Sequence, residues 1–339
     1  MQVSCRTVAY TPQGEPLQRV TLSSVNGSYV ELTNYGARWV GAWIPDDKGQ
    51  LSNVLLDCPK IENYLDDTFY MGATIGRFAN RVGNAQFGID GRIYHVDKND
   101  GANCNHGGKC GLHQKVWQTE LLPDGVSFYT RSYDGEGGWP GNVEFQVEYH
   151  WSDDYQLVVC HRATTDQKTW INLTNHAYFN LTGDSNERID GHHLCIPSDM
   201  ILETTADFIP TGQIVSVQGT PFDFQDMRPI GQYLHADNLQ LRWNRGYNHC
   251  YLLPDSVGNK IQLAATVYEP TSTRLLKVYT DLPSVLFYSA GYLPNPTTGL
   301  CLEAQYCPDT PHHPHFPQGC LLLPGQEYLH YIVYCFSCN

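Results

Sequence analysis

Short strand-like segments separated by tight-turn signals run through almost all of the 339 residues, and this pattern most constrains the fold. Residues 24–30 and 87–93 are predicted hairpins, because the Asn-Gly and Asp-Gly pairs at their centres accept the positive φ of tight turns. Residues 143–149 alternate apolar and polar with a period of two, which indicates a strand with one buried face. Further strands are predicted at residues 156–162, 260–268, 274–280 and 328–336.

Helical periodicity is scarce in the chain. Residues 61–66 and 229–235 could each form a turn or two of helix. No repeat period and no low-complexity linker divides the sequence, so we expect one domain spanning residues 1–339. Many strands at short spacing predict an all-β protein, built as a large antiparallel β-sandwich.

The composition excludes several classes of protein. The net charge of −14 would repel nucleic acid and anionic membranes, so neither is an expected partner. No apolar run approaches twenty residues, and the first residues do not have the pattern of a signal peptide. The twelve cysteines are scattered along the chain, and we interpret them as reduced thiols in a cytoplasmic protein.

Two titratable residues lie in apolar surroundings and are candidates for chemistry. His176 lies in an apolar, aromatic segment at residues 172–181, whose asparagines and threonine can fix the tautomer and aim of the ring. Glu303 lies in an apolar run, where a buried carboxylate needs a partner or a function. The alternatives are a core histidine satisfied by its neighbours, and a glutamate paired with Arg77 or Arg81.

Two other loops carry residues that suit ligand binding. Residues 72–82 contain two arginines and an asparagine, whose donors suit hydroxyl and carboxylate groups, although salt-bridged surface arginines are an equal alternative. His106 precedes two glycines that would let the backbone approach a ligand closely. Cys104 and Cys110 flank this histidine as conceivable metal ligands, but the intervening glycines and lysine favour a loop with another purpose.

Taken together, these loops resemble the aldose 1-epimerases, the galactose mutarotase family. The resemblance implies a large β-sandwich with an open sugar-binding cleft. Family members use no metal and no organic cofactor, and they interconvert the α and β anomers of free hexoses, usually galactose and glucose. The matching motifs follow in order along nearly the whole chain, at residues 35–37, 76–81, 106–108, 139–142, 172–181, 219–224, 303–309 and 324–328.

The resemblance assigns roles to individual residues. Glu303 is implied to be the base that takes the proton from the C1 hydroxyl, and His176 the acid that protonates the ring oxygen; the roles swap on reclosure. The productive form then needs an ionised glutamate and a protonated imidazole. The further sugar-contacting positions are Asn80, Arg81, His106 and Tyr178.

Two positions depart from the family pattern and leave the sugar open. Asn248 stands where the family commonly has aspartate, and its amide can still orient a sugar, so we keep it as substrate-binding. Leu286 replaces a glutamine, and leucine cannot form a hydrogen bond with a hydroxyl. The alternatives are an epimerase for a different or phosphorylated sugar, or a carbohydrate-binding protein without catalysis. The expected assembly is a monomer or a homodimer.

Overall fold

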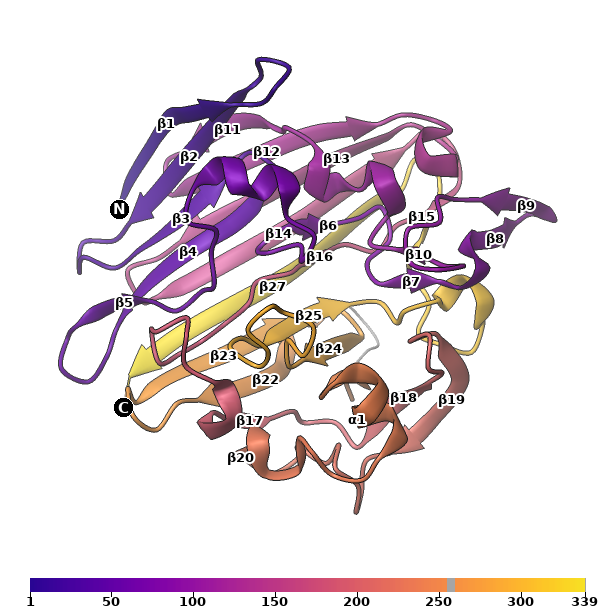
Figure 1. Cartoon of the computed structure of the whole chain (residues 1–339). Coiled ribbons are helices and arrows are strands. Elements are labelled where there is room, and N and C mark those ends of the chain that lie inside the picture. The colour runs from indigo at the N-terminus through magenta and orange to yellow at the C-terminus, as the bar shows by residue number, and fades with distance from the viewer. Residues whose placement is uncertain (255–259, 339) are drawn as a thin grey trace.

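Three larger antiparallel sheets organise the computed structural model, which describes residues 1–254 and 260–338 (Figure 1). The first sheet has the order β1-β2-β3-β4-β5, with β1 (Gln2–Tyr10), β2 (Pro16–Ser23), β3 (Tyr29–Thr33), β4 (Arg38–Pro45) and β5 (Leu51–Asn53). The second, with nine strands, has the order β11-β12-β13-β14-β27-β23-β22-β17-β20. The third has the order β19-β18-β21-β24-β25.

The strands of the second sheet are β11 (Gln118–Leu122), β12 (Gly125–Ser132), β13 (Val143–Trp151), β14 (Gln156–Thr165), β17 (His193–Cys195), β20 (Arg228–Pro229), β22 (Gln262–Tyr268), β23 (Arg274–Thr280) and β27 (Glu327–Cys338). Those of the third are β18 (Met200–Thr204), β19 (Pro210–Ser216), β21 (Asn248–Leu252), β24 (Ser284–Tyr288) and β25 (Cys301–Gln305). Two-stranded ribbons are formed by β6 (Thr74–Ile75), β7 (Arg81–Val82), β8 (Gln86–Ile89), β9 (Arg92–His95), β10 (Cys104–Asn105), β15 (Thr169–Trp170), β16 (Thr174–Asn175) and β26 (Leu321–Leu322).

Helices are short. The predicted helical turns are found as the 3-10 helices η1 (Ile61–Asp66) and η7 (Ile230–Tyr233). The sequence pattern missed α1 (Leu239–Asn244), which the Asn238 side chain caps by accepting hydrogen bonds from two backbone N–H groups. The remaining 3-10 turns are η2 (Gly83–Ala85), η3 (Gly108–Cys110), η4 (Leu112–Gln114), η5 (Glu136–Gly138), η6 (Ile189–Gly191) and η8 (Thr310–His312).

Both predicted hairpins are confirmed. The Asn-Gly turn joins β2 to β3, and the Asp-Gly turn joins β8 to β9. In the second turn Asp90 has φ 50° and Gly91 has φ 77°, and tight hairpin turns of the mirror-image type require positive φ at both positions. The predicted strands are also present, and β13 alternates buried and more exposed positions as its sequence indicates.

The core lies between the sheets, which confirms the predicted large antiparallel β-sandwich. Trp39 on β4 packs against Tyr334 on β27 with ring centroids 5.0 Å apart, and against Phe336 at 6.2 Å. These contacts join the first sheet to the second. The prediction of a single domain over residues 1–339 stays a prediction.

All twelve cysteines are unpaired thiols, as expected from their scattered positions. Within the described ranges, the structure contains no helix of the length and apolar character needed to cross a membrane.

Candidate active site

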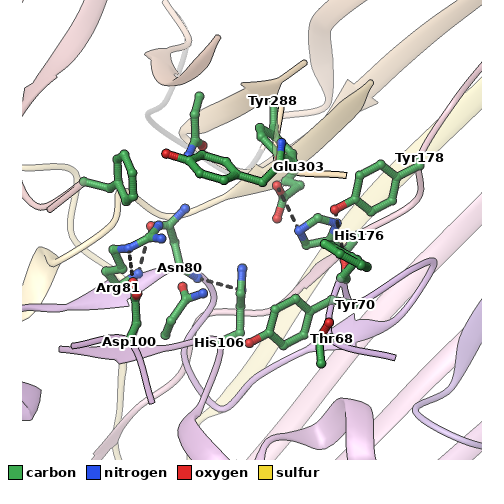
Figure 2. A pocket seen from close by; sticks show the side chains of 15 residues that line it. Thr68, Tyr70, Asn80, Arg81, Asp100, His106, His176, Tyr178, Tyr288 and Glu303 are labelled. Carbon is green, nitrogen blue, oxygen red and sulfur yellow. Dashed lines mark hydrogen bonds and ion pairs between the residues drawn. The ribbon is translucent and has the colours of Figure 1, made fainter. Parts of the chain in front are cut away.

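A cavity of about 290 Å³ opens beside the third sheet and brings together residues from distant parts of the chain. Figure 2 shows its lining, with Glu303 and His176 facing each other and Arg81 across the space from them. The cavity collects every residue that the sequence singled out for catalysis or sugar contact, namely Asn80, Arg81, His106, His176, Tyr178, Asn248 and Glu303.

Strand register places Glu303 on the sheet face that forms one wall of the cavity. On β25 it lies directly opposite Leu286 of β24. Two residues earlier, Cys301 lies opposite Tyr288, which in turn lies opposite Asn248 of β21. Because opposite residues of neighbouring strands project on the same face, the strand pattern alone directs these side chains toward the cavity.

Backbone hydrogen bonds hold His176 just beyond β16. Its N–H donates to the carbonyl of Ala73 at 2.9 Å, and its carbonyl accepts from the N–H of Gly72 at 2.9 Å. The Asn175 amide donates to the Gly72 carbonyl at 2.9 Å and to the Tyr149 hydroxyl at 3.2 Å. The expectation that the asparagines fix the ring itself was therefore wrong: the Asn175 amide donates to a carbonyl and a hydroxyl, so it holds the backbone that carries the ring.

Aromatic and sulfur contacts orient the His176 ring instead. Tyr178 stacks on it with centroids 5.0 Å apart, and Tyr70 lies on it at 5.9 Å. The Cys301 thiol lies 3.5 Å from Nδ1, and Nε2 points to the carboxylate of Glu303 with an Nε2–Oε1 distance of 3.7 Å. That separation is too long for a hydrogen bond, so the two groups face each other without being joined.

Burial governs the protonation of this pair. It raises the pKa of Glu303 to about 8, and the positive charge of Arg81 reverses only part of that shift. It also lowers the pKa of His176 to about 4. Both shifts run against the expected ionised glutamate and protonated imidazole, since removal from water disfavours either charge. Between about pH 4 and pH 8 the pair holds one proton.

His106 presents a hydrogen-bond donor to the cavity. Its Nδ1 accepts the backbone N–H of Asn80 at 3.2 Å, which leaves the ring proton of the neutral imidazole on Nε2. Burial, together with the neighbouring His176 and Arg81, holds the pKa of His106 well below its ordinary value. The ring is therefore a neutral donor.

The two arginines of the predicted loop have different functions. Arg81 lies at the rim of the cavity, where its Nε is 2.7 Å from Asp100 Oδ2 and its guanidinium lies over the Phe208 ring at 4.7 Å. Arg77 is fully buried away from the cavity and donates to backbone carbonyls, so the alternative of a surface arginine was wrong for it. Neither arginine forms an ion pair with Glu303 among the described contacts.

Tyr178 and Asn248, which the sequence predicts to contact the sugar, both line the cavity, and Leu286 lies beside it. Tyr178 lines the cavity and stacks on His176, and its hydroxyl donates to the Phe69 carbonyl at 3.0 Å; its contact with a sugar stays a prediction. Asn248 lines the cavity at the start of β21. Leu286 lines a smaller cavity that adjoins the main one.

Sequence reasoning missed most of the aromatic lining. Tyr70, Phe208, Tyr288 and Tyr292 all face the cavity. Tyr70 contacts the rings of His106 at 4.5 Å and His176 at 5.9 Å. The chain is rich in tyrosine throughout, so composition alone could not distinguish these side chains from those of the core. Among the described residues, no three His, Cys, Asp or Glu side chains are grouped to hold a metal ion.

Sequence comparison relates nearly all of the chain to proteins of known identity. The profile of a family described as aldose 1-epimerase matches residues 18–335. The chain is 37% identical to the aldose 1-epimerase of Escherichia coli strain K12, over 97% of this chain and 98% of the relative. It is 36% identical to the galactose mutarotase of Homo sapiens, over 91% of each chain.

Solved structures with the same fold cover the chain equally well. A crystal structure of an aldose epimerase homologue from C. elegans superposes with a TM-score of 0.87 at 28% identity, covering 94% of this chain and 98% of the other. That of a galactose 1-epimerase from Lactobacillus acidophilus gives a TM-score of 0.87 at 25% identity, over 100% and 99% of the two chains.

Proposed function

We propose a specific reaction for this chain, which belongs to the aldose 1-epimerase family and is an isomerase of that type. It interconverts the α and β anomers of free galactose and glucose, with Glu303 as base and His176 as acid. The observation that carries the proposal is the buried pair of Glu303 and His176 in the cavity lining. The two side chains are 3.7 Å apart, and Glu303 Oε2 has no hydrogen-bond partner within the described residues. A buried carboxylate oxygen without a partner suits a substrate hydroxyl.

Ring opening then requires two proton transfers. Ionised Glu303 takes the proton of the C1 hydroxyl, the C1–O5 bond breaks, and protonated His176 donates its proton to O5. The products are neutral glutamic acid, neutral imidazole and the open-chain aldehyde. Rotation about C1–C2 presents the other face of the aldehyde to O5, and the reverse transfers close the ring.

Burial has two opposing effects on these transfers. The reaction converts a desolvated ion pair into two neutral groups, and the neutral arrangement is the one that low-dielectric surroundings stabilise. Both arrangements contain the same single proton, so no exchange with solvent is needed between opening and closing. The same burial makes the ion pair the minor tautomer of the free enzyme between about pH 4 and pH 8, so the free energy gained in these transfers offsets the free energy needed to form the ion pair.

The remaining polar groups are suited to holding the sugar. His106 offers its Nε2–H, and Asn80 uses Oδ1 to accept the Arg81 N–H, which leaves its amide NH₂ for a hydroxyl. Arg81 has further donors beyond the Nε that contacts Asp100. Asn248 adds an amide from the opposite wall.

Polarimetry tests the proposal directly. Freshly dissolved α-D-galactose and α-D-glucose should reach their equilibrium rotation much faster with the purified protein, and added EDTA should not change the acceleration. The ratio of the two rates would identify the better substrate. No acceleration on either sugar would contradict the proposal.

The activity should also depend on pH as a bell-shaped curve. Above about pH 8 the pair loses its one proton and lacks the acid, and below about pH 4 it holds two protons and lacks the base. We therefore expect kcat/KM for galactose to fall on both sides of this range, after subtraction of the uncatalysed rate. A profile that rises through a single ionisation near pH 6.5 would contradict the shifted pair.

The alternatives rest on weaker grounds. A sugar phosphate would be expected to meet several cations, and Arg81, whose Nε contacts Asp100, is the one lysine or arginine among the described residues that line the cavity. A carbohydrate-binding protein without catalysis would not need a buried base facing an acid. The cytoplasmic location and the monomeric or dimeric state stay predictions.

A further inference from the structure

Leu286 occupies a position next to the proposed base. It lies on strand β24, between β21 and the edge strand β25, directly opposite Glu303 on one side and Cys250 on the other. All three side chains project on the same face of the sheet because they are opposite one another in register. Leu286 is buried, with 4% of its surface exposed. Leu286 therefore lies beside Glu303 on the sheet face that borders the cavity, and it lines a smaller cavity next to the main one.

A small side cavity of about 10 Å³ adjoins the main one at this wall. Its mouth is formed by residues that the two cavities share, and its inner walls by residues of its own. The volume suits a single small group. The shared residues are Asn80, Arg81, Phe208 and Asn248, and the inner walls are Leu202, Thr204, Pro210, Cys250, Leu286 and Pro308.

The inner walls offer little to a hydroxyl group. Four of their six residues are leucines or prolines, which have no side-chain donor or acceptor. The Thr204 hydroxyl already donates to Gln240 Oε1 at 3.1 Å, and the Cys250 thiol is hydrogen-bonded with that of Cys307. A hydroxyl that passes the polar mouth and reaches these inner walls would lose its water and gain no equivalent partner there, whereas a C–H or methyl group would lose nothing.

We propose that Leu286 and this side cavity make the enzyme select aldoses that lack one hydroxyl group, so that deoxyaldoses react better than galactose or glucose. The inference rests on the proposed function, since it specifies the substrate of the same site. An apolar pocket rejects an added hydroxyl only modestly, so the expected preference in kcat/KM is about 10-fold to 100-fold.

A set of matched sugars tests the selection. Each probe differs from D-galactose by one missing hydroxyl: 2-deoxy-, 3-deoxy- and 4-deoxy-D-galactose, and D-fucose, which lacks the hydroxyl at C6. Anomer exchange of each sugar is followed by polarimetry or NMR. The wild-type enzyme should give at least one of them a kcat/KM about 10-fold above that of D-galactose. Galactose equal to or better than all four would overturn the inference.

Two variants of similar side-chain volume test Leu286 itself. Leu286→Gln places an amide where it can form a hydrogen bond with the hydroxyl that galactose has and the preferred deoxyaldose lacks. This variant should cancel or reverse the preference for the deoxyaldose over D-galactose. Leu286→Met keeps the wall apolar and should retain it. An unchanged ranking in Leu286→Gln would overturn the assignment to Leu286. If none of the five sugars is accelerated, the proposed function fails and the inference with it; acceleration with galactose preferred removes the inference alone.

Discussion

Glu303→Gln should reduce kcat for galactose by about 10²–10⁴-fold and leave the affinity for the sugar nearly unchanged. Glutamine fills the same volume and can still form a hydrogen bond with the C1 hydroxyl, but it cannot take the proton. Sugar affinity is measured by calorimetry and kcat by polarimetry. This pair of measurements also distinguishes an enzyme from a binding protein, because a binding protein would not accelerate anomer exchange either before or after the substitution.

The matched control is Glu269→Gln. Glu269 is also a buried glutamate, with 4% of its surface exposed, but it does not line the cavity. Its carboxylate accepts hydrogen bonds from the backbone N–H groups of Thr271 and Ser272. Its substitution should leave kcat and sugar affinity unchanged at temperatures where the variant stays folded. Loss of both turnover and affinity in Glu303→Gln, or of neither, would count against Glu303 as the base.

Arg77→Met should lower the free energy of unfolding by about 3–5 kcal/mol. The guanidinium donates to the carbonyls of Pro140, Tyr133 and Gly141 at 2.8–2.9 Å and to Ser132 Oγ at 3.0 Å. Methionine keeps the apolar stem of the side chain but leaves these buried acceptors without a donor. Hydrogen bonds to charged groups contribute roughly 1.5–3 kcal/mol each, and the losses are not additive. Urea denaturation measures the change.

Arg81→Met is the matched control, four residues along the same segment. Arg81 contacts a partly exposed Asp100, and such pairs contribute about 0–1 kcal/mol. This variant should therefore remain stable and instead raise KM for the sugar, because Arg81 lines the cavity. Equal stability of the two variants would refute the structural role given to Arg77.

The sequence could not separate these two arginines. Both lie among small residues in one loop, and the pattern offers the same donors at each position. The fold separates them, because β7 begins at Arg81 beside the cavity while Arg77 points into the loop at residues 133–141. The partners of Arg77 lie more than fifty residues away in the chain, so no local sequence pattern predicts them.

The protonation of the acid–base pair was also beyond the sequence. Residue types and family resemblance identified Glu303 and His176 as candidates, and the structure places them 3.7 Å apart. Their pKa values depend on burial, which is set by the packing of Tyr178, Tyr70 and Cys301 around them. Desolvation acts through space, and it reversed the simple expectation for both groups.

By itself the sequence determined the strands, the two hairpin turns, the antiparallel sandwich and the candidate catalytic and sugar-contacting residues that line the cavity. These follow from period-two burial and turn chemistry, which are local, and from motifs preserved in order along the chain. The tertiary structure alone decided that Leu286 stands against Glu303, and which aromatic rings line the cavity. Strand pairing between distant segments creates these contacts, because register across a sheet fixes which side chains share a face.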